Sequence, residues 1–240
     1  MSKVTFIYPV HNRLEYNQIT LPLILEEVRT SESVSSLVIF DDMSEDGTSE
    51  WIQSLPIADF IDKPYIYQRK KIGNSTQQWN MARDLFEADY YANFCNDNLI
   101  PLGVCDLFAS ILDRNGDAFG VGGRFQSEGD TINGFNTVFP FIKESATVAA
   151  VNHLGCGMFR GDTFAKLGDV GQSVIPGEER YFGFTAYQNK ARENYWRILL
   201  HHGVTVHKLS KSFYSRLRSF HDKGYTRKVY DYPESVFNFK

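Results

Sequence analysis

Residues 4–13 read VTFIYPVHNR, and residues 37–48 read LVIFDDMSEDGT. In each segment a short apolar run predicts a buried β-strand, and the polar cluster that follows predicts a turn at the end of that strand. Residues 14–29 carry leucine and valine at roughly helical spacing, which predicts a helix between the two strands. The strands are then parallel neighbours, and both polar clusters lie at their carboxyl ends, where open α/β sheets bind ligands.

The carboxylate pair Asp41-Asp42 ends the second predicted strand. Two adjacent like charges are badly placed for stability, but they are well placed to bind a sugar or a base. Residues 46–48 have a structural explanation as well, because Asp-Gly-Thr suits a turn and a helix cap ahead of residues 49–52.

Composition favours one compact soluble domain spanning residues 1–240. Hydrophobic residues make up 42% and charged residues 22% of the chain, and no run of 18 or more apolar residues is present. The amino terminus leads directly into a strand without a signal-peptide pattern, so we expect a cytoplasmic protein. The sequence gives no indication of the oligomeric state.

Further along the chain, apolar runs predict strands at residues 65–67, 90–95 and 203–207. Helical spacing predicts helices at residues 76–87, 104–114 and 188–200. The strand at residues 90–95 ends in Asn96-Asp97-Asn98, a second polar cluster at a strand end.

A strand ending in Pro9-x-x-Asn12-Arg13, followed about thirty residues later by Asp41-Asp42-x-Ser-x-Asp-Gly-Thr, resembles the start of family 2 glycosyltransferases with the GT-A fold. The resemblance is closest over residues 4–50, continues to residue 101 and is patchy beyond. It implies an α/β fold with a mixed, mainly parallel sheet flanked by helices. It also implies that residues 1–101 bind a nucleotide-sugar donor and residues 102–207 hold the acceptor and catalytic groups.

In that family the two strand ends hold the base and ribose of the donor, which we expect to be a UDP-sugar. Carried over, Pro9, His11 and Asn12 line the nucleoside pocket, and Asp42 or Asp41 accepts a hydrogen bond from the base. The other donor-binding residues that we expect are Arg69, Lys71, Gly73, Asn96 and Asp97.

The family has Asp-x-Asp or a variant at the place of Asn96-Asp97-Asn98, and its carboxylate binds a divalent cation bridging the donor phosphates. Asp97 is therefore the predicted Mn²⁺ or Mg²⁺ ligand, with Asn98 and His207 as further metal candidates. Amides on both flanks imply weaker metal binding, or neutralisation of the phosphates by the basic run at residues 69–71. The alternative is a plain asparagine-rich turn.

Residues 177–179 read Gly-Glu-Glu where the family has Gly-Glu-Asp at a helix start, the last carboxylate being the general base. This makes Glu179 the candidate base for an inverting transfer, with Glu178 as the second choice. Alternatively, the two are ordinary acidic residues of a first helical turn.

The last forty residues are basic, with eight Lys and Arg against three Asp and Glu. We interpret residues 208–240 as a lid over the donor or part of the acceptor site, the alternative being a solvated tail. The acceptor is then a glycan or cell-surface precursor, or a hydroxylated base in DNA held by cations and aromatic rings.

Two other functions remain open. A nucleotidyltransferase has a related fold, but such enzymes usually begin with a glycine-rich phosphate loop, and residues 9–13 contain no glycine. A relative that binds a sugar nucleotide or glycan without turnover is the second, and Asn96 and Asn98 are its best support.

Overall fold

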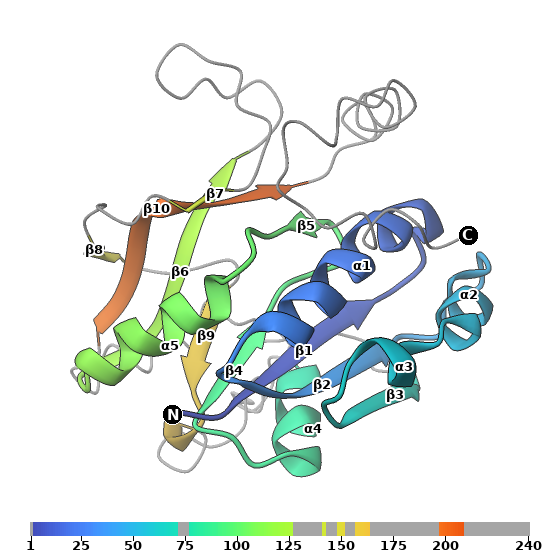
Figure 1. Cartoon of the computed structure of the whole chain (residues 1–240), viewed down its shortest axis with the longest axis horizontal. Coiled ribbons are helices and arrows are strands. Elements are labelled where there is room, and N and C mark those ends of the chain that lie inside the picture. The colour runs from blue at the N-terminus through green and yellow to red at the C-terminus, as the bar shows by residue number, and fades with distance from the viewer. Residues whose placement is uncertain are drawn as a thin grey trace, which may run out of the picture.

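The described part of the chain forms one mixed β-sheet of ten strands with helices packed on both faces (Figure 1). The computed structural model describes residues 2–71, 77–126, 141–142, 148–151, 157–163 and 197–208. Within these ranges, residues 124–126, 141–142, 148–151 and 201–208 are described as backbone only.

Four parallel strands form the first half of the sheet, in the spatial order β3-β2-β1-β4. Their bounds are β1 Val4–Val10, β2 Val34–Asp41, β3 Tyr65–Arg69 and β4 Tyr90–Asn93. Helix α1 (Leu14–Thr30) connects β1 to β2. The remaining helices of this half are α2 (Thr48–Ser54), α3 (Ile57–Phe60) and α4 (Gln77–Leu85). The predicted strand-helix-strand unit is therefore confirmed.

The second half of the sheet is mixed. Its strands are β5 Asn98–Leu99, β6 Ala118–Gln126, β7 Phe141–Ile142, β8 Val148–Val151, β9 Gly157–Arg160 and β10 Arg197–Lys208, with helix α5 (Val104–Arg114) ahead of β6. Strand β9 lies antiparallel between β4 and β6, and β10 is parallel to β6. The longer strands β6 and β10 thus run in the direction of β1–β4, which confirms the predicted mixed, mainly parallel sheet.

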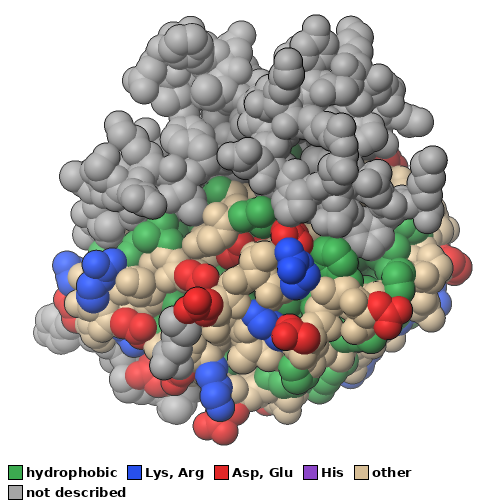
Figure 2. All heavy atoms as spheres, viewed as in Figure 1, with side chains coloured by type: hydrophobic (Ala, Val, Ile, Leu, Met, Phe, Trp, Pro, Cys, Tyr) green, Lys and Arg blue, Asp and Glu red, His purple; other side chains and the backbone are tan. Residues whose placement is uncertain are grey.

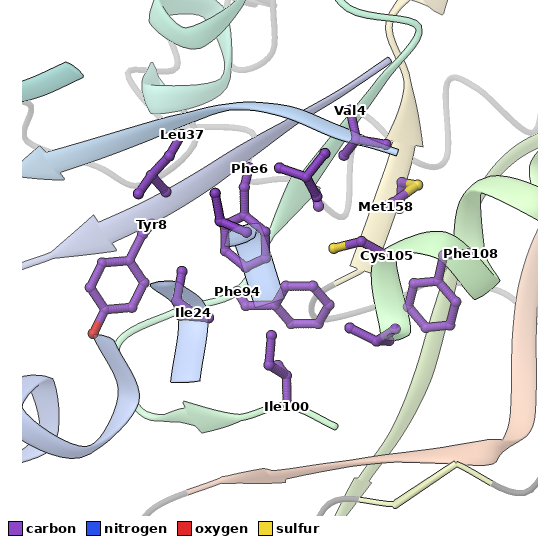
Figure 3. Packing of buried hydrophobic residues seen from close by; sticks show 14 of the residues in the cluster. Val4, Phe6, Tyr8, Ile24, Leu37, Phe94, Ile100, Cys105, Phe108 and Met158 are labelled. Atoms are coloured by element: carbon purple, nitrogen blue, oxygen red, sulfur yellow. The ribbon is translucent and has the colours of Figure 1, made fainter. Parts of the chain in front are cut away.

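The core follows from the alternation of side chains along β1. Phe6 and Tyr8 face α1 and pack with Ile24, whereas Ile7 faces the other side of the sheet and packs with Trp79 of α4. The ring of Phe6 stacks on that of Phe94 at 5.6 Å between centroids (Figure 3). The layers are therefore α1 and α5 on one face of the sheet and α4 on the other.

Strand β1 is the point where the order of the strands reverses, because β2 and β3 follow on one side and β4 lies on the other. The pairing of β1 with β4 ends at Ile7 and Asn93, while the pairing with β2 continues to Val10. Pro9 lies beyond the last β4 pair, which fits its missing N–H. The carboxyl ends of β1 and β4 are therefore no longer paired, which leaves an opening at the position where doubly wound sheets bind their ligands.

The prediction of a helix over residues 188–200 is wrong for its last four residues, which begin strand β10. Residues Ile198–His201 pair with β6 on one side and with β8 on the other, and Ile198 and Leu199 are buried. Burial between two strands outweighs the helical spacing of the apolar residues. Residues 188–196 lie outside the described ranges.

Helix α5 is anchored to α1 by one buried carboxylate. Glu27 accepts hydrogen bonds from the backbone N–H groups of Gly103 (2.6 Å) and Cys105 (2.8 Å), which are otherwise unpaired donors at the helix start. Burial raises the pKa of Glu27 to about 7, although these two bonds act in the opposite direction. The anchor fixes α5 against the sheet far from the strand ends described below.

The face of the molecule shown in Figure 2 carries acidic and basic side chains interspersed on its described part, without an extended patch of one sign. In the described ranges, no helix combines the length and the apolar character needed to cross a membrane.

Candidate donor site at the strand ends

The loops after β1 and β2 are tied together by the side chain of Asn12. Its carboxamide oxygen accepts from the backbone N–H of Glu45 (2.8 Å), and its own backbone N–H donates to Ser44 Oγ (2.8 Å). Asn12, Arg13 and Met43 have positive φ angles of 53°, 65° and 56°, a conformation in which asparagine is tolerated better than most residues. The predicted nucleoside-pocket loops are therefore preformed.

Asp46 has the structural role predicted for residues 46–48. Its carboxylate accepts hydrogen bonds from the backbone N–H of Leu14 (2.9 Å), at the start of α1, and from that of Thr48 (3.1 Å), at the start of α2. It fixes the first turns of both helices to the loop.

Asp41 is fully buried and bonded within the protein. Its carboxylate accepts from the backbone N–H of Ser44 (2.8 Å), from the hydroxyl of Tyr67 (2.7 Å) and from Ser49 Oγ. Burial by itself raises the pKa of Asp41, but the hydrogen bonds from Ser49, Ser44 and Tyr67 outweigh it and hold the pKa below the ordinary aspartate value. Asp41 thus shapes the loop from inside.

Asp42, the next residue, is half-buried and lies at the surface of the same strand end. Its backbone N–H donates to the carbonyl of Val10 (2.9 Å), and its own carbonyl pairs with Nδ1 of the exposed His11 (2.8 Å). Of the two aspartates, the structure leaves Asp42 at the surface beside His11 and Asn12, and encloses Asp41.

The basic run lies at the end of β3, next to the loop after β2. Arg69 donates to the carbonyl of Ser44 (3.0 Å), and the backbone N–H of Lys70 donates to the carbonyl of Asp41 (3.0 Å). The side chains of Arg69, Lys70 and Lys71 are exposed at this edge of the sheet. The structure therefore places Arg69 and Lys71 at the edge of the predicted donor site.

Asp97, after β4, forms an ion pair with Arg13, after β1, with 3.1 Å between Asp97 Oδ2 and Arg13 Nη1. The Asp97 side chain is 12% exposed and that of Arg13 is 52% exposed, with the Arg13 guanidinium 5.7 Å from the ring centre of Tyr16. The pair spans the opening between the β1 and β4 ends. Arg13 belongs to the motif at the end of β1, but the sequence alone predicts no role for it.

The amides that flank Asp97 are engaged within the protein. Asn96 Nδ2 donates to the carbonyl of Asn12 (3.2 Å). Asn98 donates to Asp97 Oδ1 (2.9 Å), and its own Oδ1 accepts from the backbone N–H of Cys95 (3.1 Å). Asn98 therefore orients Asp97, and one lone pair of its amide oxygen is used by the Cys95 N–H.

The donor set around Asp97 suits a cation only together with a phosphate-bearing ligand. Among the residues that the structure describes, no three His, Cys, Asp or Glu side chains come together as a metal site. Mg²⁺ in nucleotide enzymes is commonly held by one or two carboxylates, water and substrate phosphates. One carboxylate at the β4 end, facing the β1 opening, fits that pattern.

His207 is brought to this region by the sheet. In the antiparallel pairing of β10 with β5, His207 lies opposite Leu99 and Lys208 opposite Asn98. Both register positions thus adjoin the segment that follows Asp97. Lys208 is the first residue of the predicted basic lid, and the pairing with β5 places its backbone next to the segment that follows Asp97.

Other predicted site residues fall outside the described part of the chain. They are Gly73, Glu178, Glu179 and the basic tail after Lys208. A cavity of about 500 Å³ lies at the opposite edge of the sheet, around the start of β4 and the end of β9, with Arg83, Asp89 and Arg160 in its lining. It contains none of the predicted site residues, so we do not assign the donor to it.

Solved structures provide the comparison, since no protein-family model and no curated protein sequence matches the chain. TarS of S. aureus superposes with a TM-score of 0.60 at 15% identity, over 97% of this chain and 41% of that chain. A shorter TarS structure, residues 1–349 in complex with UDP, gives a TM-score of 0.58 at 16% identity, over 98% of this chain and 69% of that chain.

GalNAc-T7, solved with UDP, GalNAc and Mn²⁺, gives a TM-score of 0.62 at 10% identity. The superposition covers 88% of this chain and 44% of GalNAc-T7, so the chain spans less than half of that protein and of full-length TarS. At these identities the likeness concerns the fold. These likenesses confirm the predicted GT-A type of fold, a mixed and mainly parallel sheet flanked by helices.

Proposed function

We propose that the chain is a glycosyltransferase that moves a sugar from a UDP-sugar to a hydroxyl acceptor. The observation that carries the proposal is the convergence of Asn12, Asp42 and Asp97 on the opening between the carboxyl ends of β1, β2 and β4 in a GT-A fold. The UDP complexes of TarS and GalNAc-T7, which share this fold, support a uridine nucleotide as the ligand.

In this proposal Asp42 accepts a hydrogen bond from the uracil, and Pro9, His11 and Asn12 line the nucleoside pocket. Asp42 is preferred over Asp41 because it is half-buried, whereas Asp41 is enclosed by its own hydrogen bonds. Arg69 and Lys71, exposed at the end of β3, add positive charge at the edge of the site.

Asp97 is the proposed ligand of a divalent cation, Mn²⁺ or Mg²⁺, and the Mn²⁺ in the GalNAc-T7 structure supports this choice. When bound, the cation neutralises the charge that develops on the leaving UDP. Asn98 holds the Asp97 carboxylate in place through its 2.9 Å hydrogen bond. His207, next to this segment in the strand register, is the proposed second protein ligand.

Glu179 is the proposed general base, with Glu178 as the second choice, and a base that deprotonates the acceptor opposite the leaving group gives inversion at the anomeric carbon. A glycan or a hydroxylated DNA base is the proposed acceptor. Replacing a general base typically lowers turnover by about 10²- to 10⁴-fold, which is the expected effect of Glu179→Gln.

Thermal unfolding with UDP and Mn²⁺ tests the donor assignment. UDP at about a hundred times its dissociation constant should add about 2.7 kcal/mol to the free energy of unfolding. Slow hydrolysis of a UDP-sugar, followed by NMR of the released anomer, separates an inverting enzyme from a binding protein without turnover. If no uridine nucleotide shifts the melting temperature in the presence of Mn²⁺ or Mg²⁺, the proposal fails.

A further inference from the structure

Arg13 and Asp97 face each other across the opening between β1 and β4. Arg13 is the residue from which α1 begins, and Asp97 follows the end of β4, so each side chain is fixed to a different strand end of the same site. Arg13 places its guanidinium 3.1 Å from the carboxylate to which we assign the cation.

Both oxygens of that carboxylate have partners in the free protein. Oδ2 accepts from Arg13, and Oδ1 accepts from Asn98. Asn98 is 3% exposed and bonded at both ends of its amide, so it is held by the fold. Arg13 is half-exposed and bonds the carboxylate through one nitrogen, so water can take over its hydrogen bonds when it leaves.

We propose that Arg13 is an internal competitor for divalent cations at Asp97, which keeps the cation affinity of the donor-free protein low. The inference rests on the proposed function, since it concerns the carboxylate assigned to the cation. The Arg13 guanidinium already neutralises the carboxylate and repels a divalent cation placed beside it, so opening of the ion pair favours cation binding. Donor phosphates supply further oxygen ligands and shift this competition toward the cation.

The test is a titration of Mn²⁺ into the protein without nucleotide, with free Mn²⁺ followed by electron paramagnetic resonance. Arg13→Gln should bind Mn²⁺ about fivefold more tightly than the wild type, the factor expected for loss of a partly exposed ion pair. The helix-capping groups of Arg13 are in its backbone, so glutamine preserves them, and circular dichroism verifies the fold. The double variant Arg13→Gln/Asp97→Asn should lose the gain.

Arg29→Gln is the matched control. Arg29 lies in the last turn of α1, is 44% exposed and pairs with Glu26 through two nitrogens, so its substitution removes the same charge and an arginine–carboxylate ion pair at the other end of α1. Its Mn²⁺ affinity should equal that of the wild type. An equal gain in Arg29→Gln would indicate net charge alone and overturn the proposal.

The proposal is also overturned if Arg13→Gln binds Mn²⁺ no more tightly than the wild type, or does not bind it measurably. It is overturned as well if the gain in affinity persists in the double variant. Binding of UDP to the same proteins, measured by calorimetry, distinguishes a failure of the competition proposed for Arg13 from a failure of the proposed function. Binding of UDP with unchanged Mn²⁺ affinity in Arg13→Gln overturns only the competition, whereas absence of UDP binding to the wild type overturns the proposed function.

Discussion

The ends of β2 and β4 each present an aspartate to the same edge of the sheet, and the two carboxylates are held in different ways. Asp41 is enclosed and bonded to uncharged groups of its own loop, of α2 and of β3, while Asp97 has a charged, half-exposed partner from another strand end. Neutral hydrogen bonds to a buried carboxylate fix the shape of the loop, whereas the half-exposed Arg13 can leave the part-buried Asp97 for water. The β2 end is therefore held rigidly, and in our proposal the β4 end exchanges Arg13 for a cation.

The largest effect that tests this contrast is the loss of Asp97. Asp97→Ala should lower transfer by about 10²- to 10³-fold, the usual cost of removing a group that stabilises developing charge. The fold should remain intact, because Arg13, the charged partner of Asp97, is half-exposed and can be hydrated when the carboxylate is lost. Steady-state kinetics with UDP-sugar and Mn²⁺ measure the loss.

Asp117→Asn is the control for that measurement, because Asp117 forms an exposed ion pair with Arg197 away from the strand ends. It should keep the activity of the wild type. If sugar transfer persisted after a chelator removed all divalent cations, Asp97 would not be a cation ligand. Neutralisation of the donor phosphates would then be assigned to the basic run at residues 69–71.

The second effect is on stability and belongs to Asp41. Asp41→Ala should lower the free energy of unfolding by about 2–4 kcal/mol, because it leaves a buried N–H and two hydroxyl groups without their acceptor. Urea unfolding measures the loss. Asp42→Ala, one residue along the strand, should change stability by less than about 1 kcal/mol, and equal losses in the two variants would contradict the contrast between them.

The contribution of Asp41 to the free energy of unfolding depends on pH. Since the folded state holds the pKa of Asp41 below its ordinary value, the stabilisation by Asp41 is present above the ordinary aspartate range. It is lost as the pH falls below about 4, where the unfolded chain takes up the proton first. Asp41→Asn should flatten this acid limb of the unfolding curve.

Much of the scaffold could be predicted from sequence because its signals are local. A nearly continuous apolar run in residues 4–10 and helical spacing in residues 14–29 are sufficient to predict β1 and α1, and the polar residues that follow β1, β2 and β4 mark the candidate site. The strand predicted at residues 203–207 is part of β10, but the first residues of β10 could not be predicted in the same way. Its first residues pair with β6 and β8, and only these distant strands make it extended.

The side-chain contacts within the candidate site could not be predicted from the sequence either. Arg13 and Asp97 are 84 residues apart, so their ion pair follows from the parallel pairing of β1 and β4 rather than from any motif. The sequence also left Asp41 and Asp42 equivalent. Adjacent residues of a strand point to opposite sides, and the hydroxyls of Ser49 and Tyr67 determine which of the two is enclosed.

The third effect concerns Glu27, a buried carboxylate on α1 whose pKa is shifted in the opposite direction to that of Asp41. Burial raises the pKa of Glu27 to about 7 from an ordinary value of 4.5. Between these two values the folded state binds more protons than the unfolded state, so the contribution of Glu27 to stability falls as the pH rises. Asp106, through its negative charge, acts in the same direction.

Glu27→Gln should therefore destabilise the protein by about 2 kcal/mol less at pH 8 than at pH 5. Urea unfolding at the two pH values gives the difference, and effects of other groups cancel because both proteins share them. A destabilisation that grows with pH would show that the two backbone N–H donors favour the ionised carboxylate more than burial disfavours it.

The smallest effect decides which aspartate meets the nucleotide. Asp42→Asn should weaken UDP binding by about tenfold, because an amide replaces a charged acceptor that suits an N–H of the base. Calorimetry with UDP measures the affinity, and urea unfolding should show nearly unchanged stability, since Asp42 is half-buried. Asp41→Asn should give the reverse result, a less stable protein whose folded fraction binds UDP almost normally. If Asp41→Asn weakened UDP binding more than Asp42→Asn at temperatures where both are folded, the enclosed carboxylate would be the one that reads the base, and the loop would have to open to admit it.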